Sequence, residues 1–224
     1  MKIGLLSTIN NPMIGLYLES FEKDFNIDCV ILDPKKESKK DLLIWEERTH
    51  NKLPKKSLYS LNTLIPSFFI SSHSSKEMYN IINSRDISLL INCGTPRILN
   101  EDLINFLKIG ILNCHPGILP NYRGYSCVEW ALYNGDEVGN TCHLMTNAID
   151  EGPIICINKI DVKSFNDYES IRLAVYLDSI KCISQAIKIL ISGNYNTKDY
   201  PQNGTYYKPI DSKKMKVIVD KYSR

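Results

Sequence analysis

The sequence contains no long uninterrupted apolar run, and this absence excludes two classes of protein. No segment approaches the roughly 20 apolar residues that a transmembrane helix needs. The apolar part of MKIGLLSTIN at the N-terminus is too short for a secretory signal peptide. We therefore expect a cytoplasmic protein that has no membrane partner.

Paired cysteine motifs are missing as well. The chain has 7 cysteines, an odd number, and none of them belongs to a C-x-x-C motif. A secreted disulfide framework or a zinc site normally has such spacing, and no His/Cys/Asp cluster has it here. We therefore expect reduced, mostly buried thiols and no metal site. The cysteines are Cys29, Cys93, Cys114, Cys127, Cys142, Cys156 and Cys182.

A strong charge of either sign is absent. The formal net charge is +2, and acidic and basic residues are mixed along the chain. Surfaces that bind nucleic acid are normally basic, because they neutralise phosphates. The sequence therefore predicts no nucleic-acid partner. The apolar fraction of 43% is ample for a packed core.

Short apolar runs alternate with amphipathic stretches in the first half of the chain. This alternation predicts βαβ units and a mostly parallel sheet with flanking helices, a Rossmann-like α/β fold. The predicted strands are 2–7, 29–32, 67–71, 87–93 and 111–114, and the predicted helices are 13–25, 42–50, 75–84 and 100–108.

Longer elements follow in the second half. A helix is predicted over 128–134, and β-type segments over 139–146 and 153–162. Residues 168–191 predict a long helix, because apolar residues line one of its faces and Gly193 can end it. We expect one main domain over 1–192 and a short, loop-rich C-terminal extension over 193–224.

Asn113 and His115 stand at the end of a predicted buried strand. Residues two apart in a strand point to the same side, and the carboxyl ends of parallel strands line the crevice where α/β sheets bind ligands. An amide donor beside an imidazole suits stabilisation of an oxyanion and transfer of a proton. The alternative is that His115 is only a structural hydrogen-bonding residue.

Three further segments are of interest. The loop 116–124, rich in proline and glycine, is either a tight turn or the wall of a substrate site, with Arg123 facing an anion. Asp150 lies in a turn after a predicted strand that contains His143, although a turn aspartate is commonly just solvated. Residues 97–99, after the strand 87–93, are either a ligand contact or the start of a helix.

At these residues the chain resembles the formyltransferase family. This family includes glycinamide ribonucleotide transformylase, the catalytic domain of methionyl-tRNA formyltransferase and the nucleotide-sugar N-formyltransferases. The resemblance rests on NCHPGILPNYRG, at 113–124, and GNTCHLMTNAIDEGPII, at 139–155. The interval from His115 to Asp150 is one residue shorter than is usual in the family. The resemblance implies that residues 1–192 form a formyltransferase catalytic domain.

The resemblance implies an enzyme that uses N10-formyltetrahydrofolate and releases tetrahydrofolate. Asn113, His115 and Asp150 would be catalytic, the first two stabilising an oxyanion and Asp150 helping to manage the proton of an amine. A carboxylate beside His115 is expected to raise the pKa of its imidazole. The folate-binding residues that the resemblance implies are Arg97, Ile98, Leu99, Thr146, Asn147, Ala148, Ile149 and Asp150.

Departures from the family narrow the choice of acceptor. The stretch 7–12 lacks the glycines of a phosphate-binding loop, and we expect no C-terminal domain that would grip a tRNA. The expected acceptor is a nucleotide-linked amino sugar, such as dTDP-4-amino-4,6-dideoxyglucose, in lipopolysaccharide O-antigen biosynthesis. Tyr122, Arg123 and Tyr125 are the candidate acceptor-binding residues, because tyrosine stacks on nucleobases and arginine pairs with diphosphates. The alternative is that these three residues have ordinary packing and surface roles.

Two other functions stay open. One is a glycinamide ribonucleotide transformylase of purine synthesis, which would need an unusual phosphate site. The other is a non-catalytic module that binds folate or a nucleotide, and the intact Asn113, His115 and Asp150 argue against it. The sequence does not decide whether two copies form a homodimer.

Overall fold

The structure is a computed structural model that describes residues 1–35, 39–95, 97–196 and 203–223, without the side chains of residues 39–43. Contacts between Cα atoms divide the chain into two compact units. The first unit comprises 1–42 and 54–113, and the second comprises 43–53 and 114–224.

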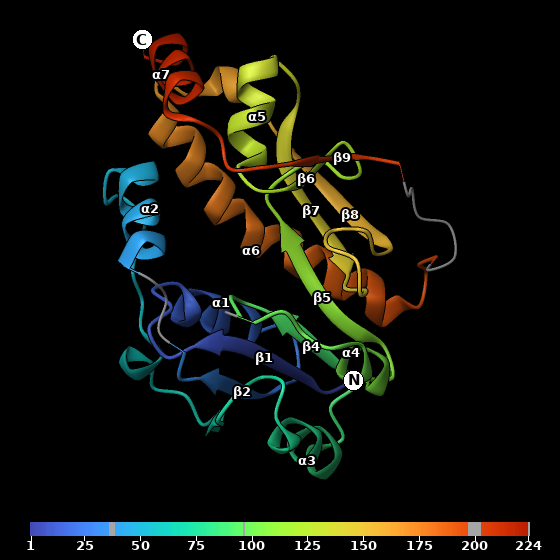
Figure 1. The fold of residues 1–224 in the computed structure, drawn as a ribbon. Coiled ribbons are helices and arrows are strands. Elements are labelled where there is room, and N and C mark those ends of the chain that lie inside the picture. The colour runs from blue at the N-terminus through green and yellow to red at the C-terminus, as the bar shows by residue number, and fades with distance from the viewer. Residues whose placement is uncertain (36–38, 96, 197–202, 224) are drawn as a thin grey trace. The chain divides into compact units, whose positions relative to one another are not determined.

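Parallel strands build the first unit (Figure 1). β1 (Ile3–Thr8) pairs with β2 (Ile27–Asp33) on one side and with β4 (Leu89–Asn92) on the other. β3 (Ser67–Phe69) pairs with β2, and β5 (Gly110–His115) pairs with β4. All six residues of β1 are buried, as expected for a strand in a sheet that is covered on both faces.

Helices connect these strands, and local sequence determines where they end. The helices are α1 (Ile14–Phe21), α3 (Lys76–Arg85) and α4 (Glu101–Phe106). The side chain of Asn100 accepts a hydrogen bond from Leu103 N at 3.1 Å, which confirms the predicted start of α4. A short 3₁₀ helix, Leu58–Ser60, precedes β3.

β5 continues into the second unit, which also contains β7 (Val138–Leu144) and β8 (Ile154–Ile160), an antiparallel pair. The hydrogen-bonded order of the sheet is β3-β2-β1-β4-β5-β7-β8, so the predicted mostly parallel α/β fold is confirmed. A second 3₁₀ helix, Val162–Ser164, follows β8.

The long helix α6 (Tyr168–Ser192) has the predicted ends. Asp167 caps it by accepting from Ser170 N at 2.6 Å, and Gly193, at φ 72, ends it. Its predicted apolar face packs into the core, where Ile171, Val175, Ile183, Ile187 and Leu190 are buried.

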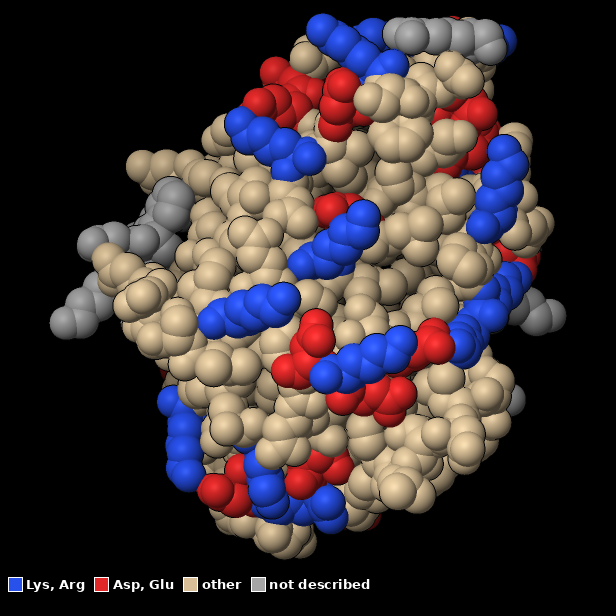
Figure 2. All heavy atoms as spheres, turned by 180° about the vertical axis from the view of Figure 1, so that it is seen from behind, with Lys and Arg blue, Asp and Glu red and all other residues tan. Residues whose placement is uncertain are grey.

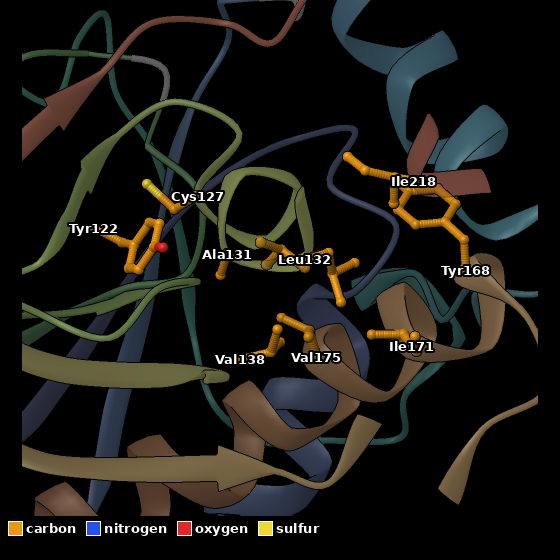
Figure 3. Close-up of a cluster of buried hydrophobic side chains, with 10 residues drawn as sticks. Tyr122, Cys127, Ala131, Leu132, Val138, Tyr168, Ile171, Val175 and Ile218 are labelled. Atoms are coloured by element: carbon orange, nitrogen blue, oxygen red, sulfur yellow. The ribbon is translucent and has the colours of Figure 1, made fainter. Parts of the chain in front are cut away.

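The expectation of a loop-rich C-terminal segment is wrong. β9 (Thr205–Tyr207) pairs in parallel with β6 (Tyr122–Gly124), and α7 (Ser212–Lys221) follows it. Ile218 of α7 is 0% exposed and lies in a hydrophobic cluster with Tyr168 of α6 and residues of α5 (Cys127–Asn134) (Figure 3). The lysines of α7 hide its amphipathic spacing in the sequence. The proposed domain boundary at 192 stays a prediction.

Part of α2 (Lys39–Thr49) belongs to the second unit. Trp45 stacks on Tyr176 of α6 with ring centroids 5.0 Å apart. Arg48 Nε lies 3.3 Å from a carboxylate oxygen of the buried Glu129. These contacts hold the segment 43–53 against α5 and α6.

Among the residues described, no helix has both the length and the apolar character needed to cross a membrane. Figure 2 shows lysine and arginine side chains interspersed with aspartate and glutamate on the face that it presents. This mixture agrees with the small net charge of +2.

Candidate active site

His115 ends β5 and is buried, and each of its ring nitrogens faces an oxygen. Nε2 lies 2.8 Å from the main-chain oxygen of Tyr122, and Nδ1 lies 3.3 Å from Oδ2 of Asp150. Because a carbonyl oxygen can only accept, Nε2 carries the hydrogen and donates it to Tyr122. The neutral imidazole therefore keeps its basic lone pair on Nδ1, on the side of Asp150.

The loop after His115 is closed over the imidazole. Thr141 Oγ1 of β7 donates to Gly117 O at 2.6 Å and accepts from Leu119 N at 3.1 Å. A Cβ atom on Gly117 would lie 2.8 Å from His115 Nε2, so glycine is required at this position. The predicted rigid loop is thus fastened to β7 and fixes the ring of His115.

Asp150 lies between two imidazoles. Its φ of 54° is in the left-handed region, which few residues other than glycine, asparagine and aspartate adopt. Oδ2 accepts from Gly124 N at 3.0 Å, and Oδ1 lies 3.7 Å from Nε2 of His143 on β7. In the sequence His143 was only a residue of the preceding strand, and its approach to Asp150 depends on how the chain returns after β7.

Burial and the neighbouring charges have opposite effects on the pKa values of His115 and Asp150. Burial lowers the pKa of His115 below its ordinary value, and the Asp150 carboxylate does not compensate. The expected rise of this pKa is therefore wrong, because charging a buried imidazole costs its hydration. Burial raises the pKa of Asp150, but the hydrogen bond with His143, the His115 imidazole and the Gly124 N–H together hold it below its ordinary value.

Asn113 precedes His115 by two residues on β5, so the two side chains face the same side of the strand. In the first unit Asn92, which ends β4, donates from Nδ2 to Asn113 Oδ1 at 2.9 Å. Asn92 Oδ1 in turn accepts from the N–H groups of Gly94 and Thr95. Since the oxygen of the Asn113 amide faces Asn92, its NH2 group is directed elsewhere as a donor. No sequence motif indicated Asn92.

The first predicted folate segment, 97–99, lies in the first unit. Arg97 donates from Nε and Nη2 to the buried Asp33, at 2.8 and 3.1 Å. Burial alone would raise the pKa of Asp33, but hydrogen bonds from Arg97 and other donors lower it to about 2. Leu99 is buried, whereas Ile98 is 86% exposed. The side chain of Ile98 and the main chain of the segment can therefore face a ligand.

The second predicted folate segment, 146–150, is the turn between β7 and β8 in the second unit. Its base is tight, because a Cβ atom on Gly152 would lie 1.6 Å from Leu144 O. Residues 147–149 are exposed, and Ile149 leaves half of its side chain in solvent. An exposed apolar side chain beside main-chain donors and acceptors suits a flat heterocycle such as a pterin.

The candidate acceptor-binding residues have different environments. Tyr122 is buried and its hydroxyl donates to Asp136. This environment favours the alternative, in which Tyr122 is a packing residue. Arg123 forms an ion pair with Glu151, and within the described residues its buried Nε has no hydrogen-bond partner. Tyr125 is 57% exposed. An acceptor role for Arg123 and Tyr125 stays a prediction.

The cysteines are free, and all are buried except Cys114, which is half-buried. Cys114 Sγ lies within 4.8 Å of the sulfur atoms of Cys142 and Cys182. Cys114 points to the side of β5 opposite His115, because its Sγ lies in this cluster whereas the His115 imidazole contacts Asp150. Linear spacing did not indicate the cluster, since its members come from different elements.

Comparisons with known proteins bear on the family to which this chain belongs. Residues 22–187 match the family model described as formyl transferase. Methionyl-tRNA formyltransferase of Borrelia duttonii (strain Ly) is 30% identical over 131 residues, which are 58% of this chain and 42% of that protein. The chain thus spans less than half the length of that relative.

Solved structures share the fold. Phosphoribosylglycinamide formyltransferase from Anaplasma phagocytophilum has a TM-score of 0.63 at 21% identity, over 93% of this chain and 99% of that one. The formyltransferase PseJ from Anoxybacillus kamchatkensis, in complex with UDP-4,6-dideoxy-4-formamido-L-AltNAc and tetrahydrofolate, has a TM-score of 0.55 at 20% identity, over 97% and 90%. The family match covers most of the sequence, including both signature segments, and the chain therefore belongs to the formyl transferase family.

Proposed function

We propose that this protein transfers a formyl group from N10-formyltetrahydrofolate to the amine of a nucleotide-linked amino sugar. The observation that carries the proposal is the contact of His115 Nδ1 with the Asp150 carboxylate, 3.3 Å apart, next to Asn113 on the same strand. In a member of the formyl transferase family this trio has the chemistry of acyl transfer to an amine.

Each of the three residues has one task. When the amine nitrogen adds to the formyl carbon, the electron pair of the C=O bond moves to oxygen, and the NH2 group of Asn113 donates to this oxyanion. His115 takes the amine proton on Nδ1, where its lone pair lies. Asp150 stabilises the imidazolium that results. When the oxyanion re-forms the C=O bond, the bond to folate N10 breaks, and the imidazolium returns its proton to N10, which leaves as tetrahydrofolate.

The main chain of 97–99, in the first unit, and the turn 146–150, in the second unit, are each proposed as a folate contact, taken by itself. Exposed apolar side chains, Ile98 and Ile149, support this assignment because a pterin ring needs a flat apolar surface. Neither segment needs a special side chain, because main-chain groups can recognise the donors and acceptors on the edge of the ring. The structure of PseJ, which shares the fold, is a complex that contains tetrahydrofolate.

The start of α1 supports a nucleotide sugar over glycinamide ribonucleotide. A phosphate-binding loop at this place would need unengaged N–H groups at the start of the helix. Here Met13 N donates to Asn11 Oδ1 at 2.8 Å, Gly15 N donates to Lys56 O at 2.9 Å, and Pro12 has no N–H. These groups are thus engaged within the protein and are not available to a phosphate.

Arg123 and Tyr125 are the residues proposed to meet the nucleotide diphosphate and its base. Arg123 lies in the loop that closes over His115 and Tyr125 follows this loop, so a ligand that they hold would be near the catalytic imidazole. The ligand of PseJ, a UDP-linked 4-formamido sugar, is the type of product expected from such an acceptor.

The test is a formyl-transfer assay with N10-formyltetrahydrofolate and three kinds of acceptor: nucleotide 4-amino sugars, glycinamide ribonucleotide and methionyl-tRNA. We expect turnover with a nucleotide sugar, and a loss of at least about a hundredfold in His115→Ala and Asp150→Asn. His50→Ala is the matched control, since His50 is an exposed histidine of the second unit. Faster turnover of glycinamide ribonucleotide or methionyl-tRNA would overturn the acceptor. No transfer to any acceptor by folded protein would favour the non-catalytic module.

A further inference from the structure

Four of the seven cysteines meet in the second unit, on four different elements. Cys142 of β7 and Cys156 of β8 are direct partners in the antiparallel register. Cys114 belongs to β5, and Cys182 belongs to α6. The remaining cysteines, Cys29, Cys93 and Cys127, lie outside this thiol cluster.

The sulfur atoms of Cys114, Cys142 and Cys182 are close enough to share one ion, whereas that of Cys156 lies outside this group of three and would have to move further to join it. Those of Cys114, Cys142 and Cys182 all lie within 4.8 Å of one another, and Cys156 Sγ lies 3.8 Å from Cys182 Sγ. Zinc–thiolate bonds of about 2.3 Å place the sulfur atoms of a tetrahedral site about 3.8 Å apart. Three sulfur atoms at 4.8 Å would surround a point about 2.8 Å from each, so a shift of about 0.5 Å per sulfur gives bonding distance.

We propose that Cys114, Cys142 and Cys182, with Cys156 as the fourth ligand, bind one Zn²⁺ ion. Thiolates are soft ligands, and a set made only of cysteine sulfur selects zinc among the common divalent ions. With four protein ligands no position is left for water or substrate, so the ion is structural. It ties β5, β7, β8 and α6 together.

The place of this ion explains what it would do. Cys114 stands between Asn113 and His115 on β5, and its side chain points to the opposite side of the strand. A bound ion would therefore fix the strand end that carries the catalytic imidazole without contacting a reactant. Binding exchanges protons for metal: each thiol that becomes a ligand releases one proton, and the sulfur electron pair forms the bond to zinc.

The test uses the full chain, reduced and stripped of metal with a chelator. After one equivalent of Zn²⁺ and desalting, we expect one zinc per chain by elemental analysis. Three to four protons should be released per ion, and zinc in hundredfold excess over its Kd should raise Tm by about 5–10 °C. Co²⁺ used as a probe should give the sulfur-to-metal charge-transfer band and the intense visible bands of a tetrahedral thiolate site.

Cys142→Ala and Cys182→Ala should each abolish the cobalt spectrum, and Cys127→Ala, a buried cysteine of the same unit outside the cluster, should keep it. If those two variants do not fold, the cobalt spectrum and the proton release of the unsubstituted chain still test whether the thiols bind the metal. Failure of the reduced chain to retain zinc, or a cobalt spectrum without sulfur ligation, would overturn the proposal. A Cys156–Cys182 disulfide that forms in air, with no zinc bound after reduction, would overturn it as well.

Discussion

The hydrogen bond from Asn92 to Asn113 offers a sharp test of the proposed oxyanion donor. Asn92→Asp changes one NH2 group to an oxygen and keeps the shape of the side chain. The other oxygen can still accept from Gly94 N and Thr95 N, which lie 3.0 and 2.8 Å from Oδ1. The loop that follows β4 should therefore keep the hydrogen bonds at its first residues.

The effect on Asn113 should be large. Its amide oxygen would face a carboxylate oxygen at about the present 2.9 Å, with no hydrogen between them. The Asn113 amide should then turn over and donate its NH2 group to the new carboxylate. Its oxygen would now point where the oxyanion forms. Loss of one oxyanion donor lowers kcat by about 10²–10³, and we expect this range for Asn92→Asp.

The assay is steady-state formylation of the best nucleotide sugar, with KM measured for both substrates. KM should change little, because the donor acts on the oxyanion and not on the bound ground state. Asn83→Asp is the matched control, because it adds the same charge on the exposed face of α3 in the same unit. Its kcat should stay within about twofold of the parent, as for a surface change.

A double-mutant cycle separates this mechanism from a general loss of folding. In the Asn113→Ala background the amide is already gone, so Asn92→Asp should cost little further activity. The reasoning fails if Asn92→Asp keeps kcat within threefold of the parent. It fails equally if the substitution lowers kcat by the same factor in both backgrounds.

Three other predictions follow from single contacts. Burial lowers the pKa of His115, so its base form should persist below pH 6.5, the ordinary histidine pKa. We therefore expect kcat/KM to be flat at neutral pH and to fall only in more acidic solution. An acid limb centred above pH 7 would contradict this. Ile218→Ala should lower the free energy of unfolding by about 2–5 kcal/mol, and Val217→Ala, its half-exposed neighbour, by about 0.5 kcal/mol or less, in chemical denaturation; equal effects would contradict the packing of α7. Gly152→Ala places a Cβ atom against Leu144 O and should displace the turn 146–150, so we expect a higher KM for folate with the fold retained by circular dichroism; an unchanged KM would remove this turn from the folate site.

The sequence by itself determined the elements whose signals are local. The start of α4 at Asn100 and the end of α6 at Gly193 depend on residues within one helical turn of each other. The parallel sheet followed from the alternation of apolar runs with amphipathic helices. The pairing of Asn113 with His115 on one side of a strand needed only the period of two along β5.

Tertiary structure alone decided the contacts between residues distant in the chain. Asp150 meets both His115 and His143 because the chain reverses between β7 and β8 and because the register shifts between Cys142 and His143. The direction of the His115 pKa shift was decided by burial, which no motif contains.

The thiol cluster is the clearest example. Its cysteines come from β5, β7, β8 and α6, and their distances in sequence resemble no known metal-binding spacing. Strand order and register place Cys142 opposite Cys156, and the packing of α6 brings Cys182 to them. Linear spacing reports only ligands that share one turn or loop, so a site assembled from four elements is visible only after the chain has folded.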